Sequence, residues 1–149
     1  MRRIWNYFFY STWKFQISFG EAIIEKPLIY LFNLVPFLRN NWSKGKNEYK
    51  RAMHDKDYGF NIGFAFGFML LSTMVIYTSI CLILVKLLSV EVGDTIYYYF
   101  FAIVTISYLT NELLIYRADT YKKYFDEFEK VSNKPLIYLS AVLFHIGIM

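Results

Sequence analysis

The sequence predicts an all-α membrane protein with two transmembrane helices, a further apolar run that would supply a third, and an aromatic-rich amino-terminal segment that is interfacial or re-entrant. The first observation is composition, because 56% hydrophobic and 21% aromatic residues in a chain of 149 exceed what one soluble domain buries. The second is that residues 59–85 contain no charge and residues 95–116 contain only Glu112. At about 1.5 Å per residue, a helix over either stretch can cross a hydrocarbon core of about 30 Å.

Three regions follow one another along the chain. Residues 1–38 form the expected membrane-surface segment, in which Pro36 would interrupt a helix. Residues 39–58 are polar and basic, and residues 59–149 form the transmembrane region. The apolar run that begins at Pro135 would reach only about 22 Å as a helix, which is less than a full crossing.

An amphipathic helix is predicted to extend the second span beyond the membrane, at about residues 117–132. Its aromatic residues recur at positions i, i+3, i+4 and i+7, and they are Tyr121, Tyr124, Phe125 and Phe128. Together with the span they would belong to one continuous helix from about Thr95 to Val131. The aromatic stripe needs a cover, which we expect to be either residues 39–58 or another subunit.

Charge is distributed unevenly around the two spans. Residues 39–57 carry six cations against three acids, whereas residues 86–94 carry one cation against two acids. The positive-inside rule therefore places the long polar segments on the cytoplasmic or matrix side. Residues 1–20 contain cations and no acid, as mitochondrial targeting segments do, so the mitochondrial inner membrane is favoured and a bacterial inner membrane is the alternative.

Several cationic and aromatic side chains flank the apolar runs and are predicted to anchor the chain among lipid head groups. They are Arg2, Arg3, Trp5, Trp13, Lys26 and Lys134. The last two begin copies of the hexamer KPLIYL, in which a lysine and a helix-starting proline precede apolar residues. Anionic phospholipid is the partner that these residues favour, and nucleic acid is not expected because no basic groove accompanies the aromatic residues.

Helix packing within the membrane is predicted at Gly59, Gly63 and Gly67. Glycines spaced four apart lie on one face of a helix and allow a second backbone to approach closely, which is a main source of association in lipid. Asn111 and Glu112 are the candidate polar contacts within the second span. Glu112 is one turn from the basic side, so pairing with Arg117 or a neighbouring subunit is favoured over a proton or ion path.

No catalytic constellation is recognisable, and we expect that the chain is not an enzyme. His145 is interpreted as a packing residue and His54 as solvated surface, because neither has a second ligand at a metal-binding spacing. The single cysteine, Cys81, excludes an intrachain disulfide and a paired-cysteine zinc site. We therefore expect no metal and no cofactor, with a bound phospholipid compatible with the composition.

These features favour a small accessory or structural subunit of a larger membrane protein complex, contributing helix packing, lipid contact and assembly, in an energy-transducing inner membrane. Other membrane subunits are the expected partners, and a homo-oligomer remains open. The alternatives are a self-assembling pore or small transporter with Glu112 in an ion path, and a bacterial membrane defence or secretion component.

Overall fold

The computed structural model describes residues 1–57, 59–89, 93–131 and 134–147, and this part of the chain is helical with short connections. The all-α class predicted from the sequence is confirmed. The helices in chain order are α1 Arg2–Gly20, α2 Lys26–Leu34, α3 Pro36–His54, α4 Phe60–Leu88, α5 Ile96–Asn111, α6 Thr120–Val131 and α7 Lys134–Ile146. The shorter turns are the π-helical η1 Glu21–Glu25 and η3 Glu112–Tyr116, and the 3-10 turns η2 Gly93–Thr95 and η4 Arg117–Asp119.

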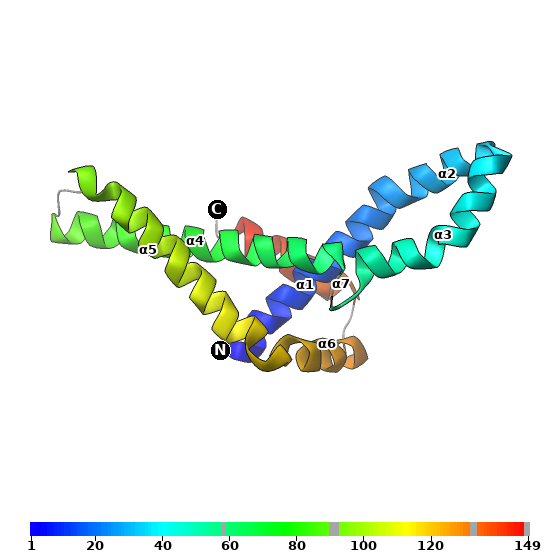
Figure 1. The fold of residues 1–149 in the computed structure, drawn as a ribbon. Helices are drawn as coiled ribbons and strands as arrows, with labels where there is room; N and C mark the ends of the chain where they lie inside the picture. The colour runs from blue at the N-terminus through cyan, green and yellow to red at the C-terminus, as the bar shows by residue number, and fades with distance from the viewer. Residues whose placement is uncertain (58, 90–92, 132–133, 148–149) are drawn as a thin grey trace.

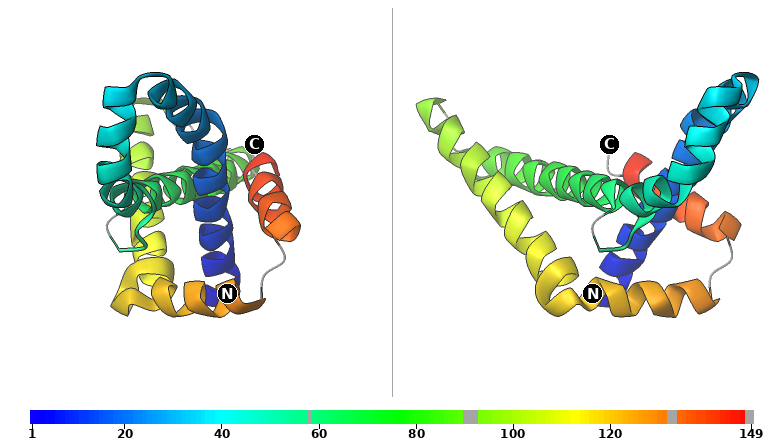
Figure 2. Two further views of the ribbon diagram at one scale, coloured as in Figure 1. Left: turned by 90° about the vertical axis from the view of Figure 1, so that its right-hand side faces the viewer. Right: turned by 45° about the vertical axis from the view of Figure 1, so that its right-hand side comes forward.

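Two helical hairpins extend in opposite directions from a shared centre (Figure 1). One hairpin is α4 with α5, and the other is α2 with α3. The centre contains α1, which contacts α4, α6 and α7. Figure 2 shows that the chain turns sharply after α5, so that α6 crosses the amino-terminal end of α1.

The two predicted spans are present as helices long and apolar enough to cross a membrane, at Phe60–Leu88 and Ile96–Tyr116. The third apolar run forms only the 13-residue helix α7, which lies against α1. At about 1.5 Å per residue this helix extends about 20 Å, so among the described residues two helices, not three, have the length of a span.

Backbone geometry explains where the helices end. Val35 is extended and Pro36 opens α3, which confirms that this proline interrupts the helix. Ser89 adopts a left-handed conformation, φ 51°, directly after α4. Asp119 has φ 52°, and this bend separates η3 from α6. The single continuous helix expected from Thr95 to Val131 is therefore wrong.

The core is formed where the aromatic face of α6 packs on α1. Phe125 is fully buried and its ring centroid lies 5.0 Å from that of Trp13, 5.1 Å from that of Tyr10 and 5.3 Å from that of Phe9. The cover of the aromatic stripe is thus α1, and not the polar segment or a second subunit that the sequence suggested. The end of the polar segment also reaches α6, where the Tyr121 hydroxyl donates a hydrogen bond to the Lys56 carbonyl at 3.2 Å.

Helix α1 is consequently an interior element over its middle turns. Five consecutive residues, from Phe9 to Trp13, are buried, and five successive positions point to every side of an α-helix. This arrangement differs from a helix that lies on a membrane surface, which buries only one face. The difference follows from α6, α4 and α7 each covering a separate side of α1.

Phe125→Ala should lower the free energy of unfolding by about 3–5 kcal/mol, because it leaves a cavity among three aromatic rings of α1. Denaturant unfolding of the purified chain in detergent micelles measures the change. Leu87→Ala is the matched control, since Leu87 is 74% exposed and its truncation leaves no cavity. Equal stability of Phe125→Ala and Leu87→Ala would contradict the packing described for α6.

Candidate functional site

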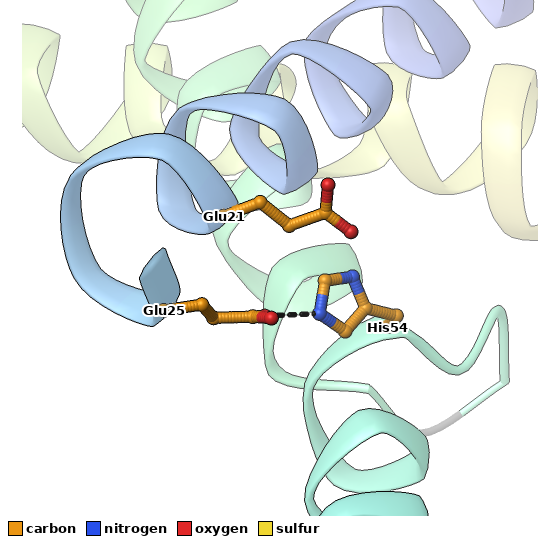
Figure 3. A group of neighbouring side chains, drawn as sticks. All are labelled: Glu21, Glu25 and His54. Atoms are coloured by element: carbon orange, nitrogen blue, oxygen red, sulfur yellow. Dashed lines mark hydrogen bonds and ion pairs between the residues drawn. The ribbon is translucent and has the colours of Figure 1, made fainter. Parts of the chain in front are cut away.

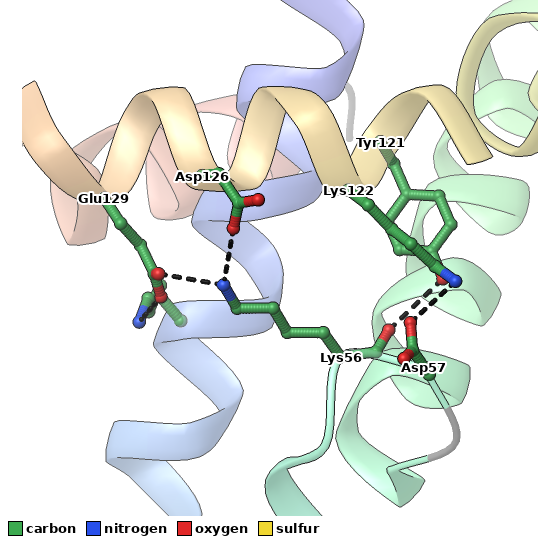
Figure 4. A network of polar contacts seen from close by, with 7 residues as sticks. Lys56, Asp57, Tyr121, Lys122, Asp126 and Glu129 are labelled. Carbon is green, nitrogen blue, oxygen red and sulfur yellow. Dashed lines mark hydrogen bonds and ion pairs between the residues drawn. The ribbon is translucent and has the colours of Figure 1, made fainter.

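A network of charged side chains lies where Lys56 and Asp57, which follow α3, meet α6 and α1 (Figure 4). Lys56 Nζ donates to Asp126 Oδ1 at 3.0 Å and to Glu129 Oε2 at 2.8 Å. Lys14 Nζ donates to the other oxygen of Glu129 at 2.9 Å. Lys122 pairs with Asp57 at 2.7 Å. We call these six residues the polar network, and it joins three segments that are distant in sequence.

The polar network shifts the pKa values of its members away from their ordinary values. Burial raises the pKa of Glu129, but hydrogen bonds from Lys56 and Lys14 outweigh burial and lower it. Burial lowers the pKa of Lys56, yet its bonds to Glu129 and Asp126 together raise it. The hydrogen bond to Asp57 raises the pKa of Lys122. The charged forms of these side chains are therefore the ones that hold α6 in place.

A buried amide at the end of α5 joins three helices. Asn111 is fully buried, and its Nδ2 donates to Thr73 Oγ1 at 2.8 Å and to the Ser107 carbonyl at 2.9 Å. Its Oδ1 accepts from Trp5 Nε1 at 3.1 Å. Asn111 thus hydrogen-bonds to α4 and α1, as a polar side chain between membrane helices is expected to do. The amide is occupied within the chain and does not point toward a solvent path.

Glu112 lies beside Asn111 but is only half-buried at the start of η3. Within the part of the chain that the structure describes, no hydrogen bond or ion pair reaches its carboxylate, so the expected pair with Arg117 is not formed. Asn111 and Glu112 are therefore neighbours with different environments: one lies in the interior and the other at its margin.

His145 lies between α1 and α4. Its Nε2 is 2.9 Å from Thr12 Oγ1 and its Nδ1 is 2.9 Å from Ser72 Oγ. Both ring nitrogens have hydroxyl partners, which is the arrangement of a packing histidine and leaves neither nitrogen for a metal or haem.

A group of two carboxylates and an imidazole lies where η1 meets the end of α3 (Figure 3). His54 Nε2 is 2.7 Å from Glu25 Oε1, and Glu21 completes a set of three ligand atoms that all lie within 4.8 Å of one another. The interpretation of His54 as solvated surface is wrong, since its side chain is 17% exposed and that of Glu25 is 8% exposed. The available signal was the i, i+4 spacing of Glu21 and Glu25 in an otherwise apolar stretch.

The three glycines of the first span have two different roles. A Cβ on Gly59 would lie 2.3 Å from the Asp55 carbonyl oxygen, so this residue permits a close turn within the chain. A Cβ on Gly63 or Gly67 would meet nothing within 4 Å. These two glycines, like Gly59, line a groove of about 610 Å³, whose other lining residues are Phe60, Phe64, Phe68 and Leu71.

The predicted head-group anchors divide between the interior and the surface. Trp13 is 2% exposed and stacks on Phe125, so burial removes it from contact with lipid. Trp5 is half-buried and bonded to Asn111. Arg3 forms an ion pair with Glu127 of α6. Arg2 and Lys26 are exposed, whereas the Lys134 side chain lies outside the described part of the structure.

Comparison with known proteins gives no family assignment: no family model, no curated protein and no solved structure matches this chain.

The protection of α6 amides from hydrogen exchange should be constant near neutral pH. It should decrease when the pH is made acidic and also when it is made strongly alkaline. The lowered pKa of Glu129 stabilises the fold above the unfolded value of about 4.3, and this contribution is lost as pH falls through the folded pKa. The raised pKa of Lys56 stabilises the fold below about 10.4, and this is lost as pH rises through its folded pKa.

Hydrogen exchange of the chain in detergent, followed by mass spectrometry, measures this protection. In Glu129→Gln the protection should no longer decrease at acid pH; this decrease is called the acid limb below. At neutral pH the variant should lose about 0.2–1 kcal/mol of stability for each exposed ion pair removed. Glu48→Gln changes an exposed carboxylate of α3 and should keep the acid limb. An acid limb of the same depth in Glu129→Gln would refute the role of this residue.

Asn111→Ala should destabilise the chain by about 1–3 kcal/mol, because Trp5 Nε1 would lose its acceptor in a part-buried position. Thermal unfolding in detergent, with tryptophan fluorescence as the probe, measures this change. Thr110→Ala, which removes the 2.9 Å bond between Thr110 and Tyr77, is the control for loss of a less buried polar contact and should cost less. A neutral Asn111→Ala variant would contradict the joining role of this amide.

Proposed function

We propose that the chain is an integral-membrane structural subunit that assembles into a larger membrane protein complex and has no catalytic role of its own. The carrying observation is the exposure of the α4–α5 hairpin: in the most apolar window of each span only 17% of the residues are buried. Leu87 and Tyr98 are 74% and 77% exposed. A fully exposed large apolar side chain forgoes about 1.5–3 kcal/mol relative to burial, so a hairpin of this composition requires lipid or protein around it.

The charge distribution supports one orientation of that hairpin. The polar network lies at the end where α4 begins and η3 ends, and the strongly basic helix α3 leads into the same end. The opposite end is the connection near Ser89, beside which Lys86 is the only cation of residues 86–94. The positive-inside rule then places α3 and α6 on the cytoplasmic or matrix side.

An energy-transducing inner membrane, the mitochondrial one favoured, is the proposed location. The support is the acid-free, cationic composition of residues 1–20. Two of those cations have structural partners, since Arg3 pairs with Glu127 and Lys14 with Glu129. These ion pairs with acidic residues of α6 explain part of the cationic composition of residues 1–20 without a targeting role. A bacterial inner membrane, which needs no mitochondrial targeting segment, is therefore the alternative location.

The proposed contact with the rest of the complex is the groove along α4. Gly63 and Gly67 line it together with Phe60, Phe64 and Phe68. Two glycines spaced four apart allow the backbone of a second transmembrane helix to approach closely, and close approach is what drives helix association when lipid replaces water. The chain itself places no atom where a Cβ on either glycine would project.

Gly63→Leu should separate folding from assembly. The free chain has room for the side chain, so helix content and membrane insertion should be unchanged, while the partner helix would be displaced. We expect at least about a tenfold loss of assembled complex, equivalent to about 1.4 kcal/mol. Native mass spectrometry of membranes extracted in mild detergent, with the chain tagged at its own expression level, measures the assembled fraction.

Gly45→Leu is the matched control, because Gly45 also has nothing within 4 Å of an added Cβ but lies on α3. It should assemble as the unmodified chain does. Unchanged partners in Gly63→Leu would refute the groove as the contact. An extract containing only copies of this chain would refute the accessory-subunit proposal and favour the self-assembling alternative.

A further inference from the structure

We propose that Glu21, Glu25 and His54 form a binding site for a divalent transition-metal ion, with zinc as the ion that their chemistry favours. The three ligand atoms lie within 4.8 Å of one another and come from two helical segments, η1 and the carboxyl end of α3. The inference is independent of the proposed function, since neither the spans nor the glycine groove contributes to this site.

The ligand set matches zinc in number and type. Zinc is bound by imidazole nitrogen and carboxylate oxygen at about 2.0–2.2 Å, and sites with three protein ligands keep a fourth position for water. With such bonds, tetrahedral ligands lie about 3.3 Å apart, and the three ligand atoms here all lie within 4.8 Å of one another. Calcium takes six to eight oxygen ligands, and magnesium favours octahedral oxygen sites, so neither suits two carboxylates and one imidazole.

Burial and charge both favour a cation at this position. Glu25 is a nearly buried carboxylate, and no lysine or arginine within the described residues pairs with it or with Glu21. Both carboxylates lie beside the same imidazole, so two like charges are held close together (Figure 3). The same negative charge is felt by Tyr49, whose pKa is raised by burial and then by Glu25. A divalent ion would compensate charge that a single histidine compensates only when protonated.

The backbone prepares the arrangement. Glu21 and Glu25 begin and end a π-helical turn, and π-turns inside longer helices occur frequently at functional sites. His54 is the last residue of α3, where Asp55 departs from helical geometry. The site would therefore hold the two ends of the α2–α3 hairpin together, and metal binding would replace the hydrogen bond between His54 and Glu25 with bonds from both side chains to the ion.

Glu21→Gln is the decisive variant, because Glu21 takes no part in the hydrogen bond between His54 and Glu25. The hairpin should stay closed while the ligand set falls to two. The chain is purified in detergent micelles with a histidine-free tag, stripped with chelator and equilibrated with zinc. We expect about one zinc per chain, measured by inductively coupled plasma mass spectrometry, and at least about a tenfold weaker affinity for Glu21→Gln by calorimetry.

Glu25→Gln and His54→Gln should abolish zinc binding, and X-ray absorption at the zinc edge should report one imidazole with oxygen ligands in the unmodified chain. Glu48→Gln, an exposed carboxylate of α3 outside the site, should bind as the unmodified chain does. Circular dichroism of each variant separates loss of a ligand from loss of the fold. The proposal is overturned if the unmodified chain holds no zinc, or if Glu21→Gln and His54→Gln retain full affinity.

Discussion

Burial of the aromatic face of α6 against α1 is the contact on which the rest of the structure depends. It joins α1 to a helix that begins more than one hundred residues later in the chain. Because α1 leads into the α2–α3 hairpin and α6 follows the α4–α5 hairpin, this contact also holds the two hairpins together. Aromatic pairs contribute about 0.5–1.5 kcal/mol each beyond their buried area, whereas exposed ion pairs contribute about 0.2–1 kcal/mol. The ring contacts of Phe125 therefore supply the docking energy, and the charges at the rim, such as Lys14 with Glu129, select its orientation.

The periodicity of the sequence predicted the α6 side of this contact but not the α1 side. The i, i+3, i+4, i+7 spacing of the α6 aromatics identifies a helix with one apolar face, and uninterrupted apolar length identifies the two spans. The partner of that face was not predictable, because the apolar and polar residues of α1 alternate without forming one face. Their distribution is explained by three neighbours: Asn6 donates to the Leu114 carbonyl, Thr12 bonds His145, and Phe9 contacts Phe125. A helix surrounded on several sides carries no simple period.

The candidate site shows the same limit more sharply. His54 and Glu25 are 29 residues apart, and a turn at Val35 and Pro36 returns the chain so that they meet. Sequence spacing reports neighbours within one helix but not across such a return, so only the Glu21–Glu25 spacing was visible beforehand. The glycine pattern was visible in full, yet its meaning was not uniform: Gly59 serves a turn within the chain, while Gly63 and Gly67 lie on an open groove.

The placement of polar side chains in the interior and of apolar side chains on the surface indicates which surroundings suit this chain. The fully buried side chains include Asn6, Ser11, Ser107 and Asn111, whereas leucines and isoleucines of α4 and α5 face outward. In water this pattern has two costs in free energy. Burial removes the polar groups from water, and the exposed apolar side chains remain in contact with it. In lipid the outward-facing apolar residues meet hydrocarbon instead of water, and small polar residues between helices provide close packing and hydrogen bonds. This combination of a polar interior with an apolar surface on α4 and α5 supports the proposal that lipid or other membrane helices surround the hairpin.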